Sequence, residues 1–169
     1  EGVRFTNGYV AHGVSGPSRA AIMTGRAPAR FGVYSNTDAQ DGIPLTETFL
    51  PELFQNHGYY TAAVGKWHLS KISNVPVPED KQTRDYHDNF TTFSAEEWQP
   101  QNRGFDYFMG FHAAGTAYYN SPSLFKNRER VPAKGYISDQ LTDEAIGVVD
   151  RAVVCVQGYG IGRGCPLHR

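Results

Sequence analysis

The alternation of hydrophobic and polar residues predicts two elements near the start of the chain. Residues 3–10 alternate well enough to predict a short strand. Residues 18–24 are then expected to form a short helix, with Ser15 as a candidate cap. Pro17 suits the first turn of this helix, because an amide hydrogen would have no partner there. Gly25 can end the helix in the left-handed conformation.

The same pattern predicts a second helix and a strand further along. Thr48 is a candidate cap for that helix, Pro51 suits its first turn, and Gly58 is expected to stop it. The expected apolar face consists of Phe49, Leu50, Leu53 and Phe54. Residues 59–64 are small and apolar, which is typical of a buried strand. A helix followed by a strand favours the α/β class, with a mainly parallel central sheet flanked by helices.

The remainder of the chain changes character twice. Residues 70–136 are rich in turn formers and polar groups, which predicts a long surface excursion, open to small elements, rather than a separate domain. Residues 139–152 predict a helix with an apolar face of Leu141, Ala145, Val148, Val149 and Ala152. Residues 153–169 are glycine-rich and contain no acidic residue, so we predict an atypical tail that is not native to the domain of residues 1–152. The glycine spacing of this tail does not match a dinucleotide-binding motif.

Composition excludes several classes of protein. The 169 residues include 16 Lys and Arg against 17 Asp and Glu, a formal net charge of −1, which argues against a nucleic-acid-binding surface. No stretch of about 18 apolar residues occurs, so no membrane-spanning helix is predicted. The two cysteines, Cys155 and Cys165, have no metal-site spacing, although they could pair with each other.

Ser15 and Arg19 form the first candidate site. A helix start offers unpaired amide groups and partial positive charge, which favour a bound oxyanion. Arg19 lies about one helical turn after Ser15 and is expected to direct a cation toward the same end. The alternative is a capping serine beside a solvated arginine, which is the more common situation for a serine before a helix.

Lys66 and His68 form the second candidate site. They follow the predicted strand, and alternation along an extended chain places both on one side. Ligands of α/β sheets bind beyond the carboxyl ends of strands, where a lysine can hold an anion and a histidine can move a proton. The alternative is a surface lysine and a hydrogen-bonded structural histidine.

Three segments in order resemble the type I sulfatases. Residues 15–26 resemble the first signature of that family, Cys/Ser-x-Pro-Ser-Arg followed after four residues by Thr-Gly-Arg. Residues 58–69 resemble the second signature, Gly-Tyr-x-Thr-x-x-x-Gly-Lys-Trp-His-Leu, and residues 103–111 are similar to a family segment that follows. The resemblance covers the chain to about residue 152, and the serine at the first signature position is typical of serine-type bacterial members.

The resemblance implies a partial alkaline-phosphatase-like domain and a sulfuric ester hydrolase mechanism. Ser15 would be oxidised to formylglycine, whose hydrate attacks the sulfur of a sulfate ester, releasing first the alcohol and then sulfate. Arg19 would hold the hydrate, Lys66 would bridge it to a sulfate oxygen, and His68 would help to move its proton. Two alternatives stay open: a phosphoester hydrolase of the same superfamily, and a truncated fragment without activity.

The resemblance also implies a calcium ion, of which this chain would supply few ligands. Ser15 would be the one metal contact, and the family's acidic ligand pairs would come from outside residues 1–169. Residues 88–89 read Asp-Asn, but they lie in the turn-rich excursion and are a poor candidate pair. The chain is therefore expected to be an N-terminal fragment of a catalytic domain, with little or no activity and marginal stability by itself.

Partners and location follow from the resemblance alone. It implies a sulfate-ester substrate such as a sulfated carbohydrate, a maturation enzyme of the radical type that generates formylglycine, and a periplasmic location. Four aromatic residues are candidates either for stacking on a sugar or for packing in the core: Tyr107, Phe108, Tyr118 and Tyr119.

Overall fold

A small four-stranded sheet forms the centre of the molecule. The computed structural model describes residues 2–71 and 94–158, and its strands lie in the order β1, β2, β3, β4. Strand β1 (Ala62–Lys66) pairs in parallel with β2 (Tyr107–Phe111) over their full lengths. The shorter strands β3 (Phe125–Lys126) and β4 (Glu129–Arg130) add antiparallel pairs. The longest pairing is thus parallel, as predicted, whereas the short hairpin is antiparallel.

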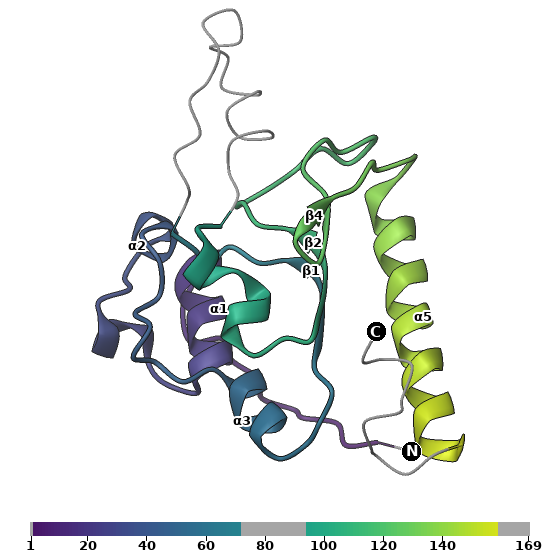
Figure 1. The fold of residues 1–169 in the computed structure, drawn as a ribbon. Coiled ribbons are helices and arrows are strands. Elements are labelled where there is room, and N and C mark those ends of the chain that lie inside the picture. Colours follow the sequence, from purple (N-terminus) through teal and green to yellow (C-terminus); the bar gives the residue numbers. More distant parts are fainter. Residues whose placement is uncertain (1, 72–93, 159–169) are drawn as a thin grey trace, which may run out of the picture.

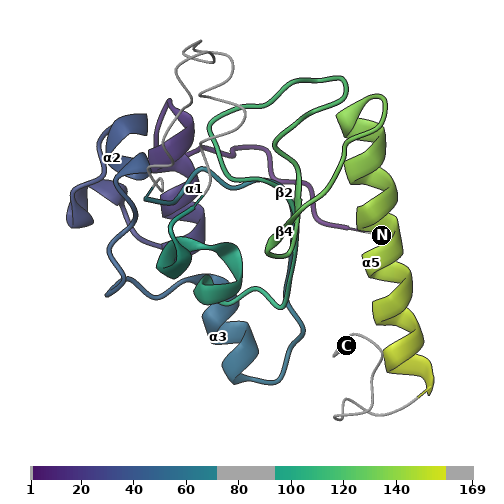
Figure 2. The same ribbon diagram turned by 45° about the horizontal axis from the view of Figure 1, so that its top comes forward.

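Helices cover both faces of this sheet. The α-helices are α1 (Ser15–Thr24), α2 (Asn36–Gln40), α3 (Leu50–Asn56) and α5 (Ile137–Gly158). Single 3-10 turns are η1 (Pro28–Phe31), η4 (Glu96–Trp98) and η5 (Pro100–Arg103). Figures 1 and 2 show α1 and α3 on one side of the strands and α5 on the other. This arrangement confirms the predicted α/β class with a sheet flanked by helices. No described helix has the length and apolarity that a bilayer crossing requires.

The alternation of side chains along β2 divides the core into two clusters. Tyr107 and Met109 belong to the cluster beneath α5, together with Val148 of that helix. Phe108, between them in the sequence, belongs to the cluster beneath α1, where the buried ring of Trp67 also lies. Strand β2 is therefore covered on both faces, although the sequence indicated only a surface excursion over residues 70–136.

The N-terminal prediction of a strand is wrong. Residues 2–14 contain no strand, and the apolar side chains of the predicted strand are 73–91% exposed: Val3, Phe5, Tyr9 and Val10. No described strand pairs with this segment, so its alternating pattern has no sheet to join. Alternation alone is insufficient without a partner strand.

Helix starts also differ from the predictions. Helix α1 begins at Ser15, so this residue is its first helical position and Val14 occupies the cap position. Helix α3 is capped by Phe49 rather than Thr48, and the Phe49 amide donates to the Glu52 carboxylate at 2.6 Å. The predicted left-handed end of α1 at Gly25 is confirmed by a φ of 65°.

Three predicted apolar faces are more exposed than expected. On α3, Phe49 is buried, but Leu50, Leu53 and Phe54 are 44–49% exposed. Strand β1 is half-exposed rather than buried, because it lies at one edge of the described sheet. Helix α5 begins two residues before the predicted position 139 and packs through Val148, while Val149 is exposed. It also continues to residue 158, across the predicted start of the tail at residue 153.

Candidate active site

The side chain of Ser15 lies between two polar groups from different parts of the chain. Its Oγ accepts a hydrogen bond from Arg19 Nε at 3.1 Å and lies 3.3 Å from His68 Nδ1. Arg19 also donates from its Nη1 to the backbone oxygen of Lys66 at 2.7 Å. The start of α1 and the segment after β1 are therefore joined at one point. The structure thus brings together the four residues that the sequence analysis assigned to the site.

Local backbone geometry explains how these residues meet. Arg19 is four positions after Ser15 on α1, and residues with this spacing share one face of a helix. His68 lies just past β1 with a φ of 60°, an unusual backbone conformation for a residue with a side chain. Its backbone amide donates to the oxygen of His112 at 3.0 Å, so the pairing of β1 with β2 continues beyond both strands. His68 is held at 2% exposure by these contacts.

The amides at the start of α1 contribute less to anion binding than the sequence suggested. The Gly16 amide donates to the side-chain oxygen of Asn36 at 2.7 Å, and Pro17 has no amide hydrogen. The Ser18 amide donates to the Val14 oxygen at 3.3 Å. Most of the first amides are therefore already committed, so side-chain cations rather than backbone groups give the site its positive character.

Close packing fixes the start of α1 against α2. A Cβ atom added at Gly16 would lie 2.6 Å from the Cβ of Ala39, which is itself fully buried. Only glycine allows this approach, because no side chain fits between the two helices. The carboxamide of Asn36 then bonds the Gly16 amide across the contact. The contact of Gly16 with Ala39 therefore fixes the position of Ser15, which is the preceding residue.

A second close approach fixes the end of β1. Gly65 pairs with Gly110 of β2, and a Cβ at Gly110 would lie 1.8 Å from the Gly65 oxygen. Gly65 also has a φ of 117°, which favours glycine. The strands can meet this closely only because position 110 lacks a side chain, whereas a Cβ at Gly65 would meet no atom within 4 Å and glycine is favoured there by the backbone angle. Lys66 directly follows Gly65, so the pairing of Gly65 with Gly110 fixes the backbone position from which the Lys66 side chain extends.

Two cations create a positive environment around Ser15. Burial lowers the pKa of Arg19 from its usual value. Burial, and then repulsion from Arg19, lowers the pKa of Lys66. Burial, followed by repulsion from Lys66 and Arg19, lowers the pKa of His68 to about 4. At neutral pH His68 is therefore uncharged, and a negatively charged group would offset the repulsion between the two cations.

Gln40 is a site residue that sequence reasoning missed. Its amide nitrogen, at the end of α2, lies 3.5 Å from His68 Nε2. An amide nitrogen is a donor, so this contact favours an unprotonated Nε2 and places the imidazole hydrogen on Nδ1, facing Ser15. No motif contains Gln40, and only the folding of α2 against α1 brings it to the site.

Other residues of the two signature segments have structural contacts. Ser18 donates to the His12 oxygen at 2.6 Å, and Thr24 donates to the Ala20 oxygen at 2.8 Å. Arg26 forms an ion pair with Glu47 at 2.6 Å. The indole nitrogen of Trp67 donates to a backbone oxygen at 3.0 Å, and its ring is buried. These observations agree with leaving these residues out of the predicted catalytic set.

Several other candidates do not reach the site. Tyr107 and Phe108 are buried in the core on opposite faces of β2, whereas Tyr118 and Tyr119 are exposed. The Asp-Asn pair at residues 88–89 lies outside the described residues, as does the proposed pairing of the cysteines, which involves residue 165.

A metal site is not assembled in the described part of the chain. Residues 2–71 and 94–151 contain no group of three or more His, Cys, Asp or Glu side chains that could hold an ion. Calcium usually takes six to eight oxygen ligands. The Ser15 oxygen alone does not meet that requirement, so these residues do not by themselves fit a calcium ion.

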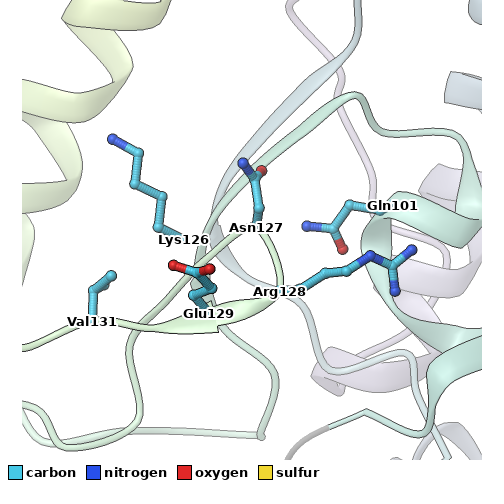
Figure 3. A pocket seen from close by; sticks show the side chains of 6 residues that line it. All are labelled: Gln101, Lys126, Asn127, Arg128, Glu129 and Val131. Atoms are coloured by element: carbon cyan, nitrogen blue, oxygen red, sulfur yellow. The ribbon is translucent and has the colours of Figure 1, made fainter. Parts of the chain in front are cut away.

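A hollow of about 450 Å³ lies away from Ser15, next to the β3–β4 hairpin. Its lining residues are Gln101, Lys126, Asn127, Arg128, Glu129 and Val131. Figure 3 shows Lys126 and Arg128 pointing away from each other, so their charges do not converge. Lys126 is paired with Glu144, and Arg128 donates to Gln99 at 2.9 Å. The hollow therefore lacks the features of an anion site.

The fold and site together define a class: an α/β protein in which a serine hydroxyl lies between a guanidinium group and an imidazole. The family model described as Sulfatase matches residues 1–153 of the chain. The chain therefore belongs to the sulfatase family, which confirms the predicted membership in the type I sulfatases.

Curated relatives agree with this assignment. An arylsulfatase of Hemicentrotus pulcherrimus is 39% identical over 112 residues, which are 63% of this chain and 17% of that protein. An N-acetylglucosamine-6-O-sulfatase of Bacteroides thetaiotaomicron is 33% identical over 153 residues, 89% of this chain and 21% of that protein. The chain thus spans about a fifth of the length of these relatives.

Solved structures show the same fold. The structure of Ps i-CgsB in complex with k-i-k-neocarrahexaose aligns with a TM-score of 0.64 at 30% identity, over 86% of this chain and 32% of that chain. The structure of BT4656 in complex with D-glucosamine-2-N,6-O-disulfate aligns with a TM-score of 0.60 at 28% identity, over 89% and 24% of the two chains.

Proposed function

We propose that the chain carries the nucleophile and three of its polar partners in a sulfuric ester hydrolase. The observation that carries this proposal is the position of Ser15 Oγ, 3.1 Å from Arg19 Nε and 3.3 Å from His68 Nδ1. The proposed substrate is a sulfate ester, whose negative charge suits the two cations of the site. Family membership supports the same reaction.

Members of this family generally use formylglycine and Ca²⁺. Formylglycine at position 15 would supply a hydrated aldehyde, whose hydroxyl attacks sulfur and whose collapse releases sulfate. The surroundings of Ser15 fit such a group, because a charged donor and an imidazole already contact its oxygen. For calcium the described residues are insufficient, so no step of the proposed reaction is assigned to a metal.

Each of the three partners has a distinct task in this proposal. Arg19 donates from Nε to the oxygen at position 15 and stabilises negative charge that develops there. His68, uncharged at neutral pH, donates a hydrogen bond from Nδ1 to the same oxygen, and its unprotonated Nε2 is the nitrogen that can accept a proton. Lys66 binds a sulfate oxygen with its ammonium group, and its side chain starts from the end of β1.

The proposed substrate is a sulfated carbohydrate. One relative is named as an N-acetylglucosamine-6-O-sulfatase, and one similar structure contains D-glucosamine-2-N,6-O-disulfate. We further propose a radical-type maturation enzyme as the partner that modifies Ser15, and a periplasmic location. The substrate, the maturation enzyme and the location are all proposed from family resemblance. Within this chain, the surroundings of Ser15 are the feature that supports them.

Mass spectrometry of the protein as its native host produces it tests the modification. The tryptic peptide that ends at Arg19 carries Ser15. Conversion to formylglycine would make this peptide lighter by two hydrogens. An unmodified peptide from a preparation that still hydrolyses sulfate esters would overturn the proposed chemistry.

Turnover of 4-nitrophenyl sulfate and 4-nitrophenyl phosphate by the same native protein tests the reaction. We expect faster turnover of the sulfate, and a loss of roughly 10³-fold or more for Ser15→Ala. Ser18→Ala is the matched control, because within residues 2–71 and 94–158 the Ser18 hydroxyl donates to the backbone oxygen of His12 and has no hydrogen bond to Ser15. Faster turnover of the phosphate would favour the phosphoester alternative instead.

A further inference from the structure

The imidazole of His112 is buried directly after β2, and the proposed reaction makes no use of it. His112 is 5% exposed. Its ring stacks on that of Phe125, with centroids 4.4 Å apart and planes within 9°, and the Phe108 ring lies 5.3 Å away. Burial lowers the pKa of His112 to about 4, so the ring is uncharged at neutral pH. The imidazole is thus held by packing against two aromatic rings, and it can hydrogen-bond only through its edge.

One hydrogen bond at this edge explains why the residue is a histidine. The backbone amide of Ser94 donates to His112 Nδ1 at 3.0 Å, so the hydrogen of the neutral ring is on Nε2. Within residues 2–71 and 94–158, Nε2 has no hydrogen-bond partner. An unpaired N–H group in the core is unfavourable, and a phenylalanine ring would stack on Phe125 without that cost. What the histidine adds is therefore the acceptor for the Ser94 amide.

Ser94 in turn joins the imidazole to the segment that follows His68. The Ser94 hydroxyl hydrogen-bonds to the Ser70 hydroxyl, and these two residues are 1% and 4% exposed. Ser70 lies two residues after His68. The Ala95 amide donates to the Lys71 oxygen at 2.8 Å, so the two segments are connected a second time. The position of the chain after His68 therefore depends on where residues 94 and 95 lie.

His112 also holds His68 directly. Its backbone oxygen accepts from the His68 amide at 3.0 Å. His68 has a φ of 60°, a conformation that costs free energy for a residue with a side chain and persists where surrounding contacts impose it. The His112 oxygen bonds the amide of this strained residue, while Ser94 and Ser70 fix the chain that follows it. These hydrogen bonds form a closed circuit that begins and ends at His112.

We propose that His112 is a positioning residue: by accepting the Ser94 amide, its imidazole keeps His68 in the backbone conformation that aims Nδ1 at Ser15. The inference rests on the proposed function, in which His68 acts on the oxygen at position 15. His68 Nδ1 lies 3.3 Å from that oxygen, so a small shift of the backbone would separate the two groups. Arg19 and the backbone oxygen to which it donates lie outside the circuit. Loss of the imidazole should therefore slow the chemical step while binding of the sulfate group is retained.

Hydrogen exchange of backbone amides, followed by NMR on the full chain, tests the effect on His68. His112→Phe keeps an aromatic ring against Phe125 and removes the acceptor. Exchange of the His68 amide should become roughly tenfold faster relative to the β1 amides. His112→Asn keeps an acceptor, because its carboxamide oxygen can face Ser94, and should restore most of the protection. A residue that merely stabilised the fold would change all these amides in proportion.

Turnover of 4-nitrophenyl sulfate tests the effect on the reaction. The measurement uses the protein as its native host produces it, carrying the same substitutions. We expect His112→Phe to lower kcat by roughly tenfold and to change KM by less than about twofold. His112→Asn should recover most of the rate, because the Ser94 amide keeps an acceptor.

Asn127→Gly is the matched control, since it also removes a side-chain acceptor from a backbone amide. The Asn127 side chain accepts from the Phe108 amide of β2 at 3.0 Å, the same length as the bond from Ser94 to His112. Asn127 has a φ of 53°, which glycine adopts without strain. This variant should leave both the relative exchange of the His68 amide and kcat unchanged.

Ser70→Ala is a second variant, for use if His112→Phe does not fold. It removes the hydroxyl link in the circuit and leaves the imidazole in place. Exchange of the His68 amide should become faster by a smaller factor, roughly threefold. Circular dichroism of each variant checks that the fold is retained.

Three results would overturn the inference. The first is a His68 amide that exchanges in His112→Phe, or in Ser70→Ala if the former does not fold, as it does in the unchanged chain. The second is faster exchange that extends in proportion to β1, and the third is an unchanged kcat despite faster exchange at His68. Failure of the proposed function has a different signature. In that case the unchanged protein would not hydrolyse the sulfate ester, while exchange at His68 would still respond to His112→Phe.

Discussion

At the scale of single residues, the signature positions were predictable and their supporting contacts were not. Ser15, Arg19, Lys66 and His68 belong to two short motifs that can be read directly, and the structure brings them together. Gln40 belongs to no motif. Its place beside His68 depends on how α2 packs, and a single sequence does not contain that information in a recognisable pattern.

We predict that Gln40→Leu changes the tautomer of His68. The amide nitrogen of Gln40 favours a hydrogen on Nδ1, so its loss should give a mixture of both neutral tautomers. Imidazole ¹⁵N chemical shifts measured at pH 7 report the tautomer directly. Gln55→Leu is the control, since the amide of Gln55 contacts Asp106 on the surface at 2.8 Å. An unchanged tautomer ratio in Gln40→Leu would contradict the assigned contact.

At the scale of elements, helices with strong end signals were predicted better than strands. Gly25 ends α1 as expected, because its φ of 65° follows from the lack of a side chain. Residues 3–10 alternate but form no strand, whereas β2 lies within a region for which a turn-rich excursion with small elements was expected. A strand needs a partner that is distant in sequence, so local alternation predicts it poorly.

We predict that Gly110→Ala strongly destabilises the chain. The added Cβ would lie 1.8 Å from the Gly65 oxygen, so β1 and β2 would have to separate at the base of the site. The expected loss is about 3 kcal/mol or more in the free energy of unfolding, measured by urea denaturation. Gly115→Ala is the control, because an added Cβ there meets no atom within 4 Å. Equal stability of the two variants would show that the strands adapt without cost.

At the scale of the whole molecule, the fold class was predictable from the order of helix and strand. What the sequence did not indicate is how unevenly the chain is buried, with Trp67, His68 and Leu69 nearly inaccessible beside a half-exposed β1. Burial depends on which segments cover an element. In this molecule Trp67 and Leu69 pack in one cluster with Phe105 and Phe108, which lie far along the chain, whereas α5 packs into the other cluster through Val148.

We predict that stability decreases as the pH falls from about 6.5 to 4. Burial lowers the pKa of His112 to about 4, and His68 has a pKa of about 4 as well. The pKa of a histidine in the unfolded chain is about 6.5. Between pH 6.5 and pH 4, these histidines therefore bind protons in the unfolded chain but not in the folded chain. For His112 the loss should approach about 3 kcal/mol at pH 4.

Thermal unfolding followed by circular dichroism between pH 7 and pH 4 measures this effect. The melting temperature of His112→Gln should depend less on pH over that range than that of the unchanged chain. His57→Gln, at an exposed position, is the control and should keep the full dependence. The lowered pKa values of Asp38 and Glu144 act mainly below this range. A melting temperature that stays constant down to pH 4 would contradict the prediction.

The bond between the Arg19 guanidinium and the Lys66 backbone oxygen has an evolutionary consequence. This hydrogen bond joins the segment around Arg19 to the segment around Lys66, 47 positions further along the chain. Because the Arg19 side chain has a fixed length, we expect neither segment to tolerate an inserted or deleted residue. A shift of one residue in either segment would rotate its reactive side chain to another face. We therefore expect related proteins to vary freely in the loops between these segments, and to inherit the spacing inside each segment without gaps.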